Sequence, residues 1–194
     1  CNFSLTKVLI STQNPHFKYM DENQQIILGK SDKNSQNFDL IIWSNKEIEK
    51  VKIPSSIKQI YSFSFMECNN LQKVEFEENS QLQKIGSYAF YSSAIENITI
   101  PKSVTEIGKS TFEWCGSLKY FKLEKGTKLQ SISDRLFIFA KDLQKVKIPE
   151  DSIIQSIGVN AFGETQISSL YIPATVEELK KGWCFWTPNL NSIT

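Results

Sequence analysis

Histidine, arginine and methionine are scarce in this chain of 194 residues, which has one histidine (His16), one arginine (Arg135) and two methionines. A single histidine leaves little scope for acid–base or metal chemistry, because histidine titrates near neutral pH and is the commonest metal ligand. The lone arginine speaks against nucleic acid as a partner. Lysine plus arginine (22) nearly balance aspartate plus glutamate (21), so the net charge of +1 gives no overall attraction to nucleic acid or lipid.

Long apolar runs, targeting signals and catalytic motifs are also lacking. No run approaches the roughly 18 consecutive apolar residues of a membrane helix, and the first residues do not join a basic start to an apolar stretch. A nucleophile elbow, an HExxH sequence, a P-loop and a dinucleotide fingerprint are all missing. We therefore expect no enzyme, no cofactor and no membrane span in this chain.

Phenylalanine is abundant, with 13 residues, and five of them occupy one position of a repeat. Apolar residues recur after steps of three, two, four, three and five residues, and three units insert two residues at the third step. The units begin at Ile48, Leu71, Ile95, Leu118, Leu143 and Ile167. Their last apolar position is Phe65, Phe90, Phe112, Phe137, Phe162 or Cys184. Six units thus cover residues 48–189 at 23–25 residues each. Such a period predicts stacked repeats with a shared core, in which the phenylalanine column is buried.

Spacing within one unit predicts its conformation. Val146 and Ile148 lie on one side of an extended segment, and Lys147 between them points the other way. Proline often follows directly and marks where the strand ladder stops, because it has no N–H to donate. These prolines are Pro54, Pro101, Pro149 and Pro173. The next stretch, Ile-Gly-x-x-Ala-Phe at residues 85–90, has the length of a helical or 3₁₀ turn.

The pattern Leu-x-x-Val-x-Ile-Pro-x-x-Val-x-x-Ile-Gly-x-x-Ala-Phe-x-x-Cys resembles the leucine-rich repeats of the BspA-like family, and residues 95–117 match it best. The units with the insertion resemble the variant repeats of protist members. The cysteine position departs from the pattern at Ser93, Ala140 and Thr165. The resemblance implies an α/β fold, a leucine-rich-repeat solenoid with a curved parallel β-sheet and short helical or 3₁₀ turns on the opposite side. It also implies a cell-surface or secreted adhesion protein.

The whole chain, 1–194, is expected to be one leucine-rich-repeat domain. A partial repeat is expected at 5–13, and the start of a further repeat at 190–194. Because neither terminus shows a polar capping unit, we expect a fragment of a longer array. Residues 14–47 break the period, and two apolar runs around a polar stretch predict a β-hairpin insertion.

Cysteines and acidic pairs offer no chemistry. Without a Cys-x-x-Cys pair, zinc binding has no support. Cys68 and Cys115 occupy equivalent positions two units apart, about 10 Å in a stack of strands, whereas a disulfide needs Cα atoms within about 7 Å. We expect buried thiols, with a bond that involves Cys1 as the alternative. Acidic pairs such as Glu77-Glu78 are expected to be solvated loop charges.

Outward-pointing strand residues are the candidate ligand contacts. Six of these twelve side chains are lysines and one is acidic. The candidates are Lys50, Lys52, Lys73, Tyr120, Lys122, Lys145, Lys147 and Tyr171. Stacked like charges repel one another, so the pattern favours an anionic partner, either a protein segment or an acidic glycan. The alternative is a solvated lysine-rich sheet that resists aggregation.

Three hypotheses of function remain from the sequence. The first is a non-catalytic binding scaffold for protein–protein contact or adhesion, with the ligand on the sheet face. The second is a structural spacer with no ligand on this segment, and the third, least favoured, is an enzyme site in the hairpin insertion.

Trp114, Trp183 and Trp186 are anchor candidates if exposed, and packing residues if buried. Sequons at Asn2 and Asn97 are possible glycosylation sites.

Overall fold

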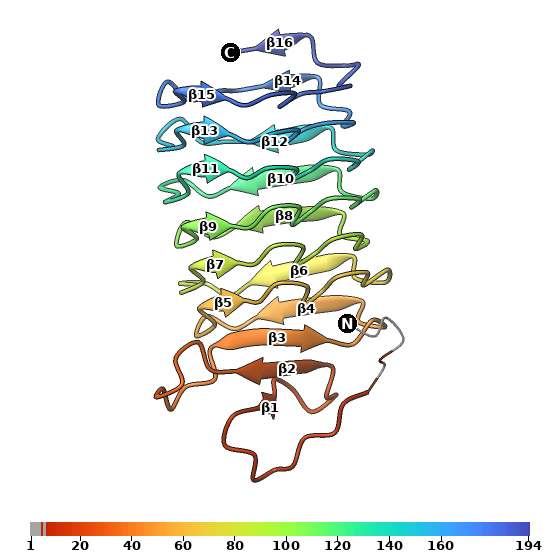
Figure 1. Ribbon diagram of the computed structural model, residues 1–194, viewed down its shortest axis with the longest axis vertical. Coiled ribbons are helices and arrows are strands. Elements are labelled where there is room, and N and C mark those ends of the chain that lie inside the picture. Colours follow the sequence, from red (N-terminus) through yellow and green to blue (C-terminus); the bar gives the residue numbers. More distant parts are fainter. Residues whose placement is uncertain (1–4, 6) are drawn as a thin grey trace.

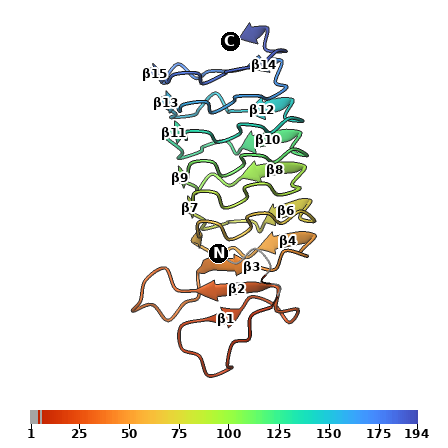
Figure 2. The same cartoon turned by 45° about the vertical axis from the view of Figure 1, so that its right-hand side comes forward.

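The computed structural model describes residue 5 and residues 7–194, and the chain forms a stack of coils along one long axis (Figure 1). The architecture is a parallel β-solenoid of about seven turns. Each repeat coil contributes two strands, of which the first is longer in all coils but the last, and the two rows of strands form opposite walls of the stack (Figure 2). The features expected at Cys1 and Asn2 lie outside the described residues.

The longer strands form the first wall, which we call the sheet wall. Their order is β12-β10-β8-β6-β4, with parallel pairing throughout. In this register equivalent apolar residues lie side by side, as Val51 does with Val74. The strands are β4 (Lys50–Ile53), β6 (Lys73–Phe76), β8 (Asn97–Ile100), β10 (Tyr120–Leu123) and β12 (Lys145–Lys147). A further parallel pair, β14 (Ser169–Leu170) and β16 (Ser192–Ile193), continues the wall.

The shorter strands and the turns after them form the second wall, which we call the turn wall. The strands are β5 (Gln59–Ile60), β7 (Lys84–Ile85), β9 (Glu106–Ile107), β11 (Ser131–Ile132), β13 (Ser156–Ile157) and β15 (Glu178–Leu179). They pair in parallel within two sheets. The first sheet includes β5-β7-β9 at its end, and the second is β11-β13-β15. Each buries one isoleucine or leucine position toward the core, except in the last coil, where Leu179 is exposed.

The prediction of helical or 3₁₀ turns is wrong. No residue that the structure describes lies in an α-helix or a 3₁₀-helix, so the helical part of the α/β expectation fails too. The backbone donors explain this. Ala89 and Tyr91 donate to the carbonyl three residues back, but Phe90 between them donates to Thr111 of the next coil. A 3₁₀-helix needs consecutive bonds of the first kind.

Left-handed backbone at two positions of each turn completes the explanation. Tyr88 and Ser92 have φ of 58° and 53°, whereas helical residues need negative φ. The same pair recurs four residues apart in other coils, for example at Ser110 and Trp114. The turn therefore alternates bonds within a coil with bonds between coils, and it joins the coils as a strand ladder would.

Phenylalanine side chains form one continuous file in the core, as the repeat predicts. Phe65, Phe90, Phe112, Phe137 and Phe162 are each fully buried. Neighbouring rings stack with centroids 5.1–5.8 Å apart. Burying one such side chain stabilises the fold by about 1.5–3 kcal/mol, so this file is a major contribution to the cohesion of the stack.

The Ile-Gly step of the repeat reflects close contact between coils. A Cβ atom on Gly108 would lie 2.3 Å from the backbone nitrogen of Ser87 in the preceding coil. On Gly86 it would lie 2.4 Å from the nitrogen of Ser62. Real Cβ atoms essentially never approach so closely, so glycine lets the coils stack at these points.

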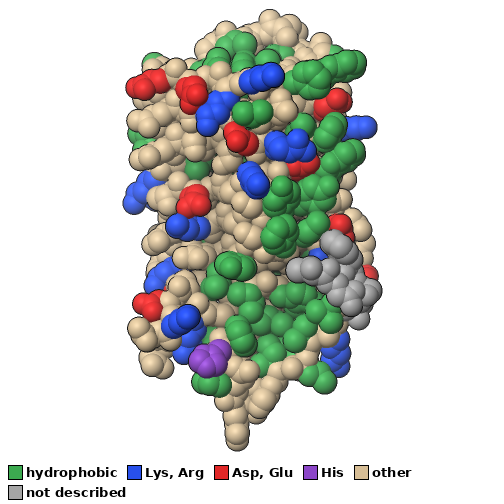
Figure 3. All heavy atoms as spheres, viewed as in Figure 1, with side chains coloured by type: hydrophobic (Ala, Val, Ile, Leu, Met, Phe, Trp, Pro, Cys, Tyr) green, Lys and Arg blue, Asp and Glu red, His purple; other side chains and the backbone are tan. Residues whose placement is uncertain are grey.

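The predicted hairpin insertion is present at the N-terminal end of the stack. It consists of β1 (Lys18–Tyr19), β2 (Ile26–Gly29) and β3 (Leu40–Ser44), which pair antiparallel. β3 then pairs in parallel with β5. Ile26 and Ile41 are fully buried in the same core cluster as the repeats, so the hairpin covers this end of the core. Hydrophobic side chains gather over the same end in Figure 3.

A buried carboxylate ties the hairpin to the first coil. Asp39 is 2% exposed and accepts hydrogen bonds from the backbone N–H and hydroxyl of Ser31, at 2.8 and 2.9 Å. Lys58 Nζ lies 3.2 Å from a carboxylate oxygen of Asp39. Burial opposes ionisation, but the Ser31 hydrogen bonds and Lys58 outweigh it, so the pKa of Asp39 is lowered.

Candidate ligand-binding face

The outward side chains of the sheet wall form two columns, because alternate residues of a strand point to opposite faces. One column contains Lys50, Lys73, Asn97, Tyr120 and Lys145. The other contains Lys52, Glu75, Thr99, Lys122 and Lys147, and Tyr171 follows β14. The sequence-predicted contacts therefore share one face, but they do not form one continuous basic stripe.

In the N-terminal part of the face, the positive charge of the lysines is partly neutralised by an acidic residue. Lys50 lies beside Lys73, yet Lys73 Nζ is 2.9 Å from a carboxylate oxygen of Glu75. Lys52 is paired in register with the same Glu75. Glu75 therefore pairs with Lys73 and lies beside Lys52, which reduces the repulsion among the positive charges.

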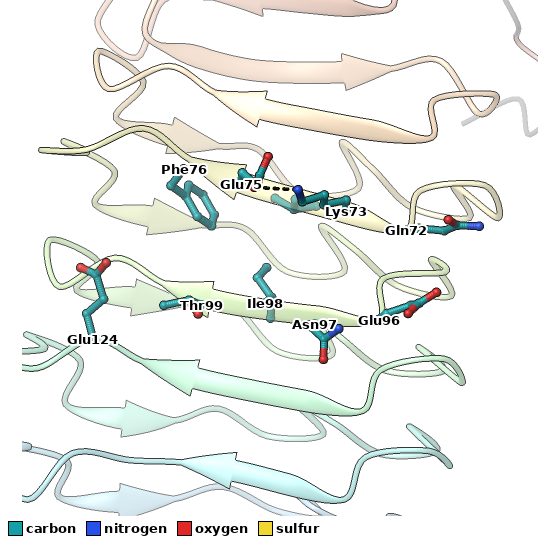
Figure 4. Close-up of a pocket in the computed structure, with 10 residues that line it drawn as sticks. Gln72, Lys73, Glu75, Phe76, Glu96, Asn97, Ile98, Thr99 and Glu124 are labelled. Carbon is teal, nitrogen blue, oxygen red and sulfur yellow. Dashed lines mark ion pairs between the residues drawn. The ribbon is translucent and has the colours of Figure 1, made fainter.

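The middle of the face is a hollow with acidic walls (Figure 4). β6 and β8 pair in register only at Lys73 and Asn97, whereas β8 and β10 pair at four positions. The resulting pocket of about 530 Å³ is lined by Glu75, Glu96 and Glu124 together with the half-buried Phe76. This interruption of the basic stripe was not predicted from the sequence.

Proline accounts for part of that opening. The carbonyl of Ile53 accepts the N–H of Glu77, and the carbonyl of Ile100 accepts that of Glu124, at 3.0 and 3.1 Å. At the equivalent place after β8 stands Pro101, which has no N–H for the carbonyl of Phe76. The same holds for Pro149 after β12, where a second hollow opens.

The C-terminal part of the face has lysines that form no ion pair. Lys122 and Lys147 are direct neighbours in register, and Lys145 pairs with Tyr120. Among the residues that the structure describes, no ion pair involves Lys122, Lys145 or Lys147. The hollow beside them, about 660 Å³, is lined by Lys122, Lys125, Lys147, Pro149 and Tyr171, among others. We call Tyr120, Lys122, Lys145, Lys147 and Tyr171 the C-terminal lysine patch.

Exposed aromatic residues gather on the turn wall. The sequence analysis identified only the tryptophans among them as candidates. Trp114 is 44% exposed and stacks on Phe139, with ring centroids 4.4 Å apart. Phe63 stacks on Tyr88 at 5.3 Å. Trp186 is exposed too, whereas the half-buried Trp183 packs edge-on against the core residue Phe162. Trp114 and Trp186 are therefore exposed, as an anchor for a partner would be, whereas Trp183 is a packing residue.

An ion pair with one buried partner lies on the same wall. Glu113 is 4% exposed, and its carboxylate accepts hydrogen bonds from Nη2 and Nε of Arg135 at 2.6 and 3.2 Å. The hydrogen bond to Glu113 raises the pKa of Arg135. Burial, and then the charges of Glu113 and Glu67, raise the pKa of Tyr91. The pair fixes the turn between two coils, and neither partner faces the sheet wall.

Thiols and metal-ligand groups form no site in the part of the chain that the structure describes. Cys68, Cys115 and Cys184 are free, and the first two are buried. Burial raises the pKa of Cys115 to about 11, so its thiol is protonated at neutral pH. Among described residues no group of three or more metal-ligating side chains could hold an ion. Nor does any stretch of residues 7–194 form a helix that could cross a bilayer.

The fold and this face define a leucine-rich-repeat type of solenoid. The sequence profile of the family described as "BspA type Leucine rich repeat region (6 copies)" matches residues 36–154 and 77–191. The chain therefore belongs to the BspA-type leucine-rich-repeat family. A comparison with curated proteins finds no match.

Solved structures show the same fold. A leucine-rich cell surface protein from Faecalibacterium prausnitzii is 21% identical, with a TM-score of 0.68, over 95% of this chain and 55% of the other. A leucine-rich repeat protein from Eubacterium ventriosum is 20% identical, with a TM-score of 0.66, over 90% of this chain and 50% of the other. The chain thus spans about half the length of these two proteins.

Proposed function

We propose that the chain is a non-catalytic binding scaffold of a cell-surface or secreted protein, with a protein or acidic-glycan partner on the sheet wall. The proposed contacts are Lys50, Lys52, Lys73, Tyr120, Lys122, Lys145, Lys147 and Tyr171. Family membership supports the scaffold, since repeat solenoids present long rigid surfaces whose outward side chains vary while the core stays fixed. The description of the Faecalibacterium protein as a cell surface protein supports the location.

The observation that carries the proposal is the uncompensated charge of Lys122, Lys145 and Lys147. Lys122 and Lys147 lie directly opposite each other, where like charges destabilise a sheet, and none of the three lysines has an acidic partner among the described ion pairs. An anionic partner that binds only the folded chain would remove the repulsion and stabilise the fold. A solvated sheet without a ligand gains nothing from this arrangement except resistance to aggregation.

The test replaces Lys50, Lys73, Lys122 and Lys147 together by serine. We expect the parent chain to be retained on immobilised heparin and on an acidic protein, and the variant to elute from both at much lower salt, because exposed charges are screened by salt. The control removes the same charge elsewhere, through Lys109, Lys128, Lys141 and Lys181 to serine, which are all exposed and outside the sheet-wall strands.

Two results would overturn the proposal. If the parent chain shows no retention at low salt, the sheet wall has no anionic partner, and the structural spacer becomes the better interpretation. If both variants lose the same retention, the attraction comes from net charge and not from this face.

A further inference from the structure

We propose that the partner is an extended segment of another protein. Three of its side chains, at alternate positions, are acidic, acidic and large apolar in that order, and the order can run from the N-terminus or from the C-terminus of the segment. This segment would lie along β12 and over the hollow beyond its last residue. The inference rests on the proposed function, because it names the ligand of the same face, and it assigns that ligand to the C-terminal lysine patch alone.

Strand geometry makes Lys145 and Lys147 a match for an extended chain. The two lysines are two residues apart on one strand, and so are about 6.6 Å apart along it. An extended partner has the same rise, so its side chains at alternate positions have the same spacing. Two carboxylates placed in this way can each meet one ammonium group. Across the coils the lysines are only about 4.8 Å apart, which does not fit that spacing.

Neighbouring side chains define the flanks of this track. Tyr120 lies beside Lys145, and Lys122 lies beside Lys147, on the β10 side. Tyr171 lies on the β14 side and is half-buried. A tyrosine ring with an exposed hydroxyl can both pack against a backbone and donate a hydrogen bond to it. The flanks thus suit a polypeptide with carboxylates beneath and polar backbone above.

The hollow selects the side chain at the third alternate position of the segment. The next alternate position, just beyond the end of β12, falls at Pro149, two residues after Lys147 and within the lining of the 660 Å³ hollow. Leu123, Ile148, Pro149 and Tyr171 supply apolar lining, and Glu150 and Asp151 also line it. A third carboxylate would meet those two acidic side chains there, whereas a phenylalanine or leucine would be accommodated.

Two competing ligands or sites fit less well. A sulfated glycan has anionic groups for the lysines but no large apolar side chain for the hollow. The N-terminal lysines could hold carboxylates, but Glu75 already neutralises part of their charge, and the hollow next to them has the acidic walls of Glu75, Glu96 and Glu124. Charge complementarity therefore favours an acidic peptide at the C-terminal lysine patch.

The experiment compares two labelled peptides of the same composition by fluorescence anisotropy against the full chain. One contains Glu-Ser-Glu-Ser-Phe and the other Glu-Ser-Phe-Ser-Glu, in identical flanking sequence. We expect the first to bind about tenfold more tightly, because in the direction parallel to β12 its carboxylates meet both lysines and its phenylalanine reaches the hollow. The second peptide cannot make all three contacts in either chain direction. The Lys145→Ser/Lys147→Ser variant should lose this preference, and Lys50→Ser/Lys52→Ser should keep it.

Equal affinity for the two peptides would overturn the inference, and so would a preference that survives the β12 substitutions. Heparin oligosaccharide that binds more tightly than either peptide, at the same lysines, would assign the face to a glycan and also overturn it. In both cases the parent chain could still be retained on heparin or an acidic protein through the sheet wall, so the proposed function would stand. Failure of the parent chain to bind any polyanion would overturn both.

Discussion

Outward side chains change freely from coil to coil on the sheet wall, whereas the turn wall is limited by its backbone. In register, Lys73 is followed by Asn97 and then by Tyr120, three unrelated residue types at one position. On the turn wall the same two positions of each coil adopt positive φ, and alternate N–H groups bond to the next coil. The comparison indicates that backbone bonds between coils and the core hold the stack together, whereas the outward side chains of the sheet wall are free to vary.

The largest difference between core and sheet wall is expected at Phe112. Replacing Phe112, which is fully buried between Phe90 and Phe137, by alanine removes its ring contacts with both of them and with Phe121, and leaves a cavity. We expect the free energy of unfolding to fall by about 3–5 kcal/mol in urea titrations. Lys122→Ser in the next coil should change it by no more than about 0.5 kcal/mol. Equal effects would contradict the division between the walls.

The close contact between coils on the turn wall can be tested by adding one methyl group at a glycine. Gly108→Ala places a Cβ 2.3 Å from the backbone nitrogen of Ser87, so the two coils must move apart. We expect a loss of about 1–3 kcal/mol or more in the free energy of unfolding. The matched control is Gly116→Ala in the same repeat, where a Cβ would have no heavy atom within 4 Å. Thermal unfolding of both variants makes the comparison, and similar melting temperatures would show that the coils yield easily.

Breaking an ion pair on the turn wall should cost more stability than breaking one on the sheet wall. Arg135→Met leaves the carboxylate of Glu113 buried without its partner, and we expect a loss of about 1–3 kcal/mol, since Arg135 itself is partly exposed. Lys73→Met breaks the exposed pair with Glu75 on the sheet wall and should cost less than about 1 kcal/mol. Chemical denaturation at low and high salt measures both. A larger loss for Lys73→Met would reverse the ranking of the walls.

Sequence periodicity was sufficient for the core and for the outward columns, because both depend on which positions recur. Phe90 and Lys147 could be placed without coordinates, since each is a fixed number of steps from its neighbours in a unit. The turn conformation could not. Residues 85–90 have a length that suits a 3₁₀ turn, and nothing in their side chains shows that Phe90 donates to the next coil and not to its own.

Interruptions of the lysine stripe were only partly visible in the sequence. Pro101 and Pro149 indicate where strand pairing ends, and Pro149 lines the C-terminal hollow. The sequence does not reveal that Glu96 and Glu124, which flank their strands, line one hollow together with Phe76 (Figure 4). It also cannot separate a compensated lysine such as Lys73 from an uncompensated one such as Lys147, because that depends on which side chains meet in space.

The smallest expected effect is a gain in stability on the sheet wall. In Lys147→Ser the repulsion from Lys122 disappears and no ion pair of the described residues is lost, so we expect the free energy of unfolding to rise by up to about 0.5 kcal/mol at low salt. The gain should vanish at high salt, where exposed charges are screened. Lys73→Ser, which loses its partner Glu75, should show no gain at either salt concentration. If Lys147→Ser instead destabilises the free chain, this lysine contributes to folding, and its lack of a partner no longer argues for a ligand.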